Sequence, residues 1–134
     1  MNRMKALRTI LTINLLVLFA QFAFAGMMIG GDWYSTAKLL HGATGVLLVL
    51  LALTQLSLAI TMKRKRACPA WLVTANIGLV VAEVIEAICG HFHVVTLHVP
   101  LALGIGAGVM RQLFWIRRET VTREDQASDR KSVV

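Results

Sequence analysis

The stretch AKLLHGATGVLLVLLALTQLSLAITMKRKR, residues 37–66, decides the fold of this 134-residue chain. Residues 37–62 carry one charge, on Lys38, and four consecutive basic residues follow them. At about 1.5 Å of rise per residue, a helix of this length crosses the roughly 30 Å hydrocarbon core of a bilayer. Because no water satisfies backbone polar groups there, the run is predicted to be a transmembrane α-helix.

Three further runs of the same character lie before and after it, at about 10–29, 70–89 and 97–116. Each approaches the roughly 20 residues that a spanning helix needs. The runs are apolar on all faces, whereas the helices of a soluble core would be amphipathic. We therefore predict an all-α, single-domain protein: an integral membrane up-down four-helix bundle over residues 1–118, followed by a polar cytoplasmic tail at 119–134.

The first run also has the outline of a secretory signal peptide, with a basic start, an apolar centre and the small-residue triplet Ala23-Phe24-Ala25. Its apolar stretch continues through Ile29, which is long enough for a complete span, and the chain starts at Met1. We therefore expect this segment to be retained as the first span.

The basic residues predict the orientation of the bundle. All lysines and arginines except Lys38 fall at one end: before the first span, in the 63–66 link, and at or beyond the end of the fourth span. The positive-inside rule places that end, with both termini, in the cytoplasm. We expect a multi-pass protein of the plasma membrane, which is the inner membrane if the source is a bacterium. The net charge of +7 is thus a topology signal, and no folded basic surface for nucleic acid is expected.

All four histidines map to the opposite, outer half of the protein: His41, His91, His93 and His98. His41 begins the second span and His98 the fourth, so their rings should lie at similar depth. Spans two and four are diagonal partners in a sequential bundle, and neighbouring axes about 8–10 Å apart make this diagonal roughly 11–14 Å. We expect the two rings to be too far apart to touch, and correctly spaced to face each other across a flat metallated ring.

Imidazole is a standard axial ligand of heme iron, so the pair predicts heme b bound between His41 and His98. Gly45, one turn after His41, would leave room for a large planar group, although small residues also mediate helix packing. Lys38 at the outer rim either pairs with a heme propionate or is an ordinary snorkelling lysine. The predicted function is a b-type cytochrome that transfers electrons, with quinol or another redox protein as a candidate partner.

A rival set of ligands lies around the second outer loop, at Cys89, His91, His93 and His98. Soft and imidazole ligands this close together suit copper or zinc. His91 or His93 is also an alternative second heme ligand. On this reading the protein is a non-redox accessory subunit or a metal-handling protein.

Glu83 and Glu86 are three residues apart on the third span and therefore share a helix face. They lie roughly 6–10 Å below its outer end, where unpaired carboxylates are costly. One reading is a proton route to a redox centre or a quinol. The other is hydrogen bonding to the loop histidines or to Gln21 and Thr44.

The segments His41-Gly42-Ala43-Thr44-Gly45 and Leu97-His98-Val99-Pro100-Leu101-Ala102 resemble the four-helix unit of heme A synthase. That family, and similar small bacterial membrane proteins, carry a histidine at the head of the second and fourth helices. The resemblance covers residues 1–118 and implies a four-helix fold with His41 and His98 as heme ligands. The family's catalytic glutamate, three residues before the second-helix histidine, is replaced by Lys38. A heme-modifying or heme-handling enzyme is therefore the alternative, and electron transfer without a substrate of its own is favoured. Both functions are compatible with a homo-oligomer or with a subunit of a larger membrane complex.

Overall fold

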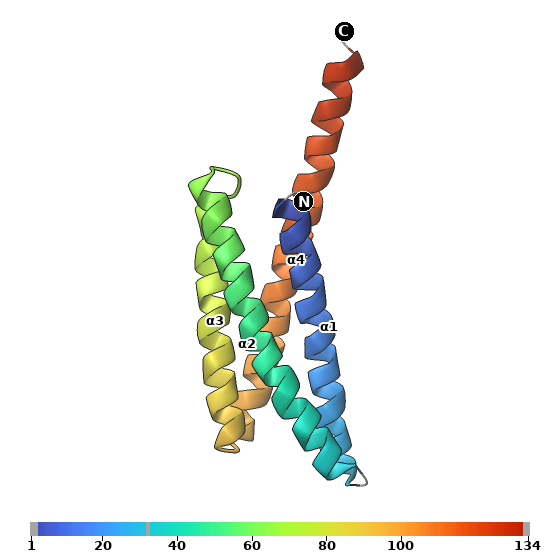
Figure 1. The fold of residues 1–134 in the computed structure, drawn as a ribbon, viewed down its shortest axis with the longest axis vertical. Helices are drawn as coiled ribbons and strands as arrows, with labels where there is room; N and C mark the ends of the chain where they lie inside the picture. The colour runs from blue at the N-terminus through green and yellow to red at the C-terminus, as the bar shows by residue number, and fades with distance from the viewer. Residues whose placement is uncertain (1–2, 32, 133–134) are drawn as a thin grey trace.

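The computed structural model describes residues 3–31 and 33–132, with side chains described through residue 122. It contains α1 (Arg3–Gly30), α2 (Tyr34–Arg64), α3 (Ala70–His91) and α4 (Val95–Ser132), and no strand among these residues (Figure 1). Each helix includes a stretch long and apolar enough to cross a membrane. The prediction of an all-α chain with four such helices is confirmed.

Successive helices run antiparallel, and both chain ends lie at the same end of the bundle (Figure 1). We call this the basic end, because it also holds the Lys63-Arg64-Lys65-Arg66 connection. The opposite end, with the connections α1–α2 and α3–α4, is called the histidine end. Each helix packs on its two neighbours in the order α1, α2, α3, α4, so α2 and α4 face each other diagonally. Beyond residue 116, α4 continues as a helix through Ser132 and projects past the other three helices.

The interior of the bundle follows a seam of residues spaced three or four apart. On α1 the buried side chains at this spacing are Met4, Leu7, Leu11, Asn14, Leu18 and Gln21, and Ala6 is buried beside them. This spacing is that of the inward positions of a coiled coil. Other helices repeat it, and the seam carries these buried polar side chains: Asn14, Gln21, Gln55, Asn76, Glu83, Glu86 and Gln112.

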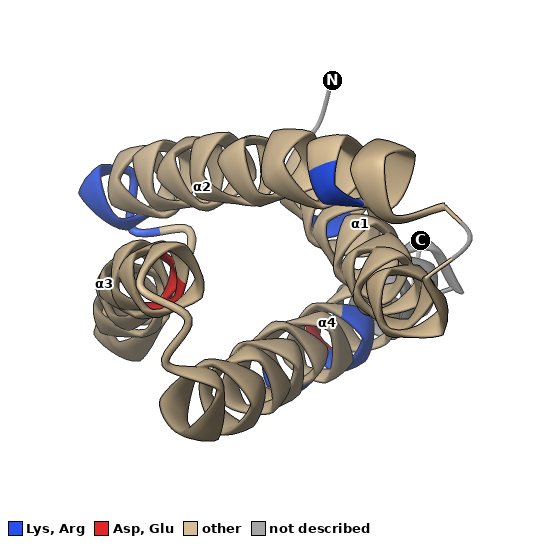
Figure 2. Cartoon of the chain, turned by 90° about the horizontal axis from the view of Figure 1, so that it is seen from below, with Lys and Arg blue, Asp and Glu red and all other residues tan. Residues whose placement is uncertain are grey.

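The expectation that the spans are apolar on all faces is therefore wrong on their inward side. The surface that would face lipid is apolar, with Leu16, Phe19, Leu39 and Leu103 largely exposed. The acidic segment of α3 instead lies on the side that faces the bundle interior (Figure 2). This distribution is the inverse of a soluble bundle, because lipid is a poorer partner for polar groups than protein is.

Two helix ends share one turn geometry. Arg66 after α2 and His93 after α3 both have positive φ, 54° and 59°. The N–H of Ala67 donates to the carbonyl of Met62 at 2.9 Å, and the N–H of Val94 donates to that of Cys89 at 2.8 Å. These six-to-one bonds satisfy helix-terminal carbonyls in the manner of a Schellman motif, whose left-handed position normally favours glycine. His93 is thus part of a helix stop.

We expect His93→Gly to stabilise the protein by up to about 1 kcal/mol, because glycine adopts the left-handed conformation without steric cost. His91→Gly is the matched control: His91 is the last helical residue of α3, where glycine is expected to destabilise by roughly 0.5–1 kcal/mol. Unfolding in mixed detergent, followed by circular dichroism, measures both. Destabilisation by His93→Gly would mean that the imidazole makes an interaction beyond occupying the turn.

Candidate functional site

His41 of α2 and His98 of α4 meet at the histidine end of the bundle. Their ring centroids are 6.1 Å apart and the rings are inclined at 63°. The expectation that the diagonal is too wide for the rings to touch is therefore wrong. A helix with its side chains has a diameter of about 10–12 Å, so each side chain reaches about half that distance from its helix axis. Two imidazoles that point inward from diagonal helices therefore span most of the roughly 11–14 Å between the axes.

Both histidines use the same ring nitrogen toward the protein. The Nδ1 of His41 lies 3.2 Å from the carbonyl oxygen of Gln21, and the Nδ1 of His98 lies 3.0 Å from that of Glu86. Because a carbonyl oxygen only accepts, Nδ1 is the donor in each ring. The Nε2 lone pair of each neutral ring is left free, which is the arrangement that backbone carbonyls impose on metal-binding histidines.

Glu86 brings a second acceptor to His98. Its Oε1 lies 3.2 Å from the same Nδ1, and the carboxyl group is buried. A carboxylate behind a histidine fixes the orientation of the ring and raises the basicity of the opposite nitrogen. Glu83 is also buried, and its Oε1 has no hydrogen-bond partner among the described residues. Of the two predicted carboxylates, the structure places Glu86 directly behind a histidine and Glu83 one turn nearer the basic end.

On the α1 side, Gln21 supports His41 through its backbone and Thr44 through its side chain. The Thr44 hydroxyl hydrogen-bonds the Gln21 Oε1 and also lies 2.7 Å from the carbonyl of Leu40. A Cβ added to Gly45 would lie 3.2 Å from the Gln21 Nε2. The space that Gly45 was predicted to leave for a planar group is therefore taken by the Gln21 amide.

Gly90 is a further site residue, which the sequence pattern alone did not single out. A Cβ at this position would lie 2.9 Å from Cε1 and 3.3 Å from Nδ1 of His98. The imidazole therefore packs directly on the α3 backbone, one turn beyond Glu86. Glycine at this point of the helix is what permits the contact.

The remaining predicted site residues lie elsewhere. Lys38 is exposed, with its Nζ 6.0 Å from the centroid of the Tyr34 ring, as expected of a snorkelling lysine. His91 and His93 are exposed, and the His91 ring packs edge-on against Phe92 at 5.1 Å. Among the described residues no three His, Cys, Asp or Glu side chains converge on one point. The loop set of Cys89, His91, His93 and His98 is thus not assembled, because the α3 terminus turns its two histidines outward.

The 6.1 Å between the ring centroids is close to the roughly 6 Å that two metal–imidazole bonds of about 2 Å each would give along one line. With Nδ1 as the donor, Nε2 is the ring nitrogen left to bind a metal. A macrocycle at this level needs lateral space as well, and the Gln21 amide beside Gly45 has to turn aside to provide it.

Nearer the basic end, the seam holds a second polar layer that sequence reasoning missed. The Asn76 Nδ2 donates to Gln112 Oε1 at 2.9 Å and to the carbonyl of Leu72 at 2.7 Å. Several buried atoms have no partner within the described chain, including Asn14 Oδ1, Gln112 Nε2 and both polar atoms of Gln55. The available signal was the seven-residue spacing of Asn14 from Gln21 and of Asn76 from Glu83, which puts polar residues on one seam.

Comparison with protein-family models, with curated proteins and with solved structures gives no match for this chain.

We expect Gly90→Ala to displace the His98 ring, because the added Cβ occupies the space of Cε1. The hydrogen bond to the Glu86 carbonyl should weaken, and overpacking should cost about 1–3 kcal/mol of stability. Gly42→Ala is the matched control, since a Cβ there meets nothing within 4 Å. Thermal unfolding and the ¹⁵N NMR signals of the His98 ring nitrogens measure the two effects. Identical behaviour of the two variants would contradict the contact between Gly90 and His98.

Proposed function

We propose that this protein is a membrane b-type cytochrome that binds heme b between His41 and His98 and transfers electrons. The observation that carries the proposal is the matched pair of imidazoles on diagonal helices, each with Nδ1 on a backbone carbonyl and Nε2 free. Heme, when bound, supplies a reversible one-electron iron couple. The resemblance of the two histidine segments to heme A synthase supports the same ligand pair.

The chain's own residues would hold and tune the site. The carbonyls of Gln21 and Glu86 keep each ring in one tautomer, and the Glu86 carboxyl group strengthens His98 as a ligand. Two histidine ligands leave no open coordination position for a substrate. Lys38, in place of the synthase's glutamate, also supplies no base. Electron transfer, with quinol or a redox protein as partner, is therefore favoured over chemistry on the heme itself.

We further propose that the basic end faces the cytoplasm of a bacterium and that the histidine pair lies near the outer face of its inner membrane. The support is the concentration of lysine and arginine at one end of four apolar helices. A reporter fused after residue 134 or inserted at 66 should read cytoplasmic, and one at 31 external. A periplasmic reading at 134 would overturn this orientation.

His41→Ala and His98→Ala are each expected to abolish heme binding, because one remaining imidazole gives a weak, five-coordinate site. His91→Ala and His93→Ala are the matched controls and should keep the heme, since both rings point away from the pair. The measurement is the oxidised and reduced absorption spectrum of the detergent-purified protein, with heme quantified as its pyridine complex. Wild-type protein that stays colourless after heme supplementation would contradict the cytochrome proposal. Loss of colour in His93→Ala but not in His98→Ala would show that the loop residue His93, and not His98, is the heme ligand.

A pH-dependent midpoint potential is expected, because reduction adds a negative charge beside Glu86 and favours proton uptake by its carboxyl group. The potential should fall as pH rises. Glu86→Gln should flatten this slope and raise the potential at high pH, since a fixed neutral group no longer stabilises ferric iron. Glu83→Gln should change the pH slope of the potential less than Glu86→Gln does. Glu119→Gln, at the basic end, should leave that slope unchanged. Redox titrations across about pH 5–9 make the comparison. Equal slopes in wild type and Glu86→Gln would assign this glutamate a structural role.

A further inference from the structure

A groove between α3 and α4 runs from the basic end into the middle of the bundle. It consists of two adjoining cavities of about 680 Å³ and 280 Å³, which share Trp71 and Arg111 as lining residues. The larger cavity opens between Trp71, Trp115 and Arg118 at the basic end. The smaller one continues inward past Gly104. The mouth of this groove lies at the basic end, opposite to the histidine pair, and its inner end reaches Ala82 and Leu101.

The mouth of the groove is cationic and aromatic. Arg111 and Arg118 are seven residues apart and therefore share one face of α4. The Arg111 guanidinium lies 5.3 Å from the centroid of the Trp71 ring, which in turn packs edge-on against Trp115 at 5.4 Å. No ion pair joins either arginine to a carboxylate among the described side chains. Arg111 belongs to an apolar span, where an arginine without an anionic partner is costly.

Two arginines on one face of α4, next to tryptophan rings, suit a phosphate. Arginine presents a planar fork of donors that fits phosphate oxygens, and tryptophan rings favour the level of lipid head groups. A neutral head group, such as that of a quinone, would leave both charges uncompensated. Charge complementarity therefore selects an anionic ligand at the mouth.

The deep part of the groove is apolar and open. A Cβ added to Gly78 or to Gly104 meets nothing within 4 Å, so methylene groups have room there. Gln112 also lines the smaller cavity, but it is only 1% exposed and belongs to the buried polar layer, where its Oε1 accepts from Asn76.

We propose that this groove binds one anionic phospholipid from the leaflet at the basic end. The phosphate lies between Arg111 and Arg118, and one acyl chain follows the space beside Gly104 and Gly78. Basic pockets between transmembrane helices bind lipid head groups by this combination of charge and apolar contact. The inference does not depend on heme.

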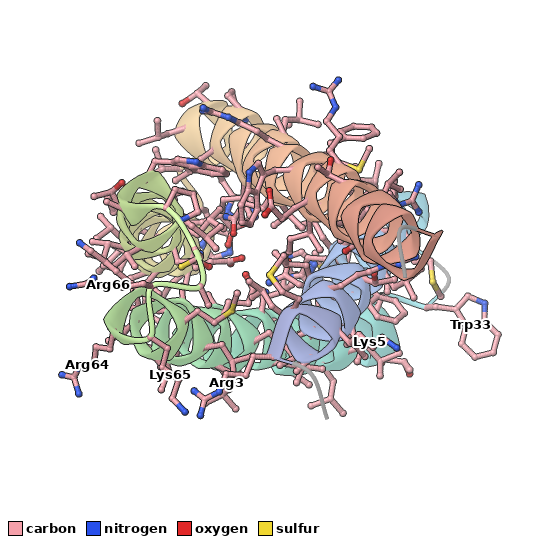
Figure 3. The ribbon with its side chains drawn as sticks, turned by 90° about the horizontal axis from the view of Figure 1, so that it is seen from above. Arg3, Lys5, Trp33, Arg64, Lys65 and Arg66 are labelled. Atoms are coloured by element: carbon pink, nitrogen blue, oxygen red, sulfur yellow. The ribbon has the colours of Figure 1, made fainter. Side chains whose placement is uncertain are left out.

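The test is native mass spectrometry of the full chain, titrated with phosphatidylglycerol or with phosphatidylcholine of the same acyl chains. Wild type should bind one phosphatidylglycerol about tenfold more tightly than phosphatidylcholine. Arg111→Gln/Arg118→Gln should bring this preference close to one. Arg64→Gln/Arg66→Gln is the matched control, because it removes the same charge from side chains that project away from the bundle (Figure 3). This variant should keep the preference for phosphatidylglycerol. An unchanged preference in Arg111→Gln/Arg118→Gln would overturn the proposal.

A second variant probes the acyl chain without touching the charges. Gly104→Leu fills open space, so it should weaken the binding of both lipids several-fold while their ratio stays as in wild type. Gly26→Leu, which also meets nothing within 4 Å, is the control on α1 and should bind as wild type does. Glycerol phosphate should not compete, because it lacks the chain. Displacement of the bound lipid by glycerol phosphate, or by a short-chain quinone, would show that the occupant is not a phospholipid.

Discussion

Everything in this bundle depends on one constraint: lipid offers no hydrogen-bond partner, so polar groups within the spans have to find partners inside the protein. The four helices meet this constraint by placing their amide and carboxyl side chains on an inward seam, among buried leucines, while the outward surface is apolar. The seam is therefore both the packing surface and the place where chemistry is possible. A soluble bundle would separate these two roles, with polar residues outside and packing inside.

The histidine pair is a direct consequence of this constraint. An imidazole in a span needs an acceptor for its N–H, and the nearest acceptors are carbonyl oxygens on the neighbouring helix. His41 takes that of Gln21 on α1, and His98 takes that of Glu86 on α3. Each ring is thereby turned so that its other nitrogen is available to a ligand. Packing of the His98 ring on Gly90 completes the geometry, because any larger residue would occupy the same volume.

The two ends of the bundle consequently offer different chemistry. At the histidine end, two imidazoles from diagonal helices meet, with the Glu86 carboxyl group behind one of them. At the basic end, Arg111 and Arg118 have no internal partner among the described carboxylates and stand next to tryptophan rings, which suits an anionic head group. The two sites are about 13 residues apart along α4, or roughly 20 Å, so their ligands do not compete for space.

The sequence by itself determined the four helices, their order and the grouping of charges at one end, because length and hydropathy decide these without any packing information. It also predicted that His41 and His98 lie at one level on diagonal helices. Only the tertiary structure decided that their rings are 6.1 Å apart, that Gln21 fills the space beside Gly45, and that His93 forms a helix stop. Such features depend on how far side chains reach from two helix axes and on which carbonyl a ring meets. The first two relations arise between helices distant in sequence, so no local pattern encodes them, and a histidine in the left-handed position departs from the glycine that would have signalled the stop.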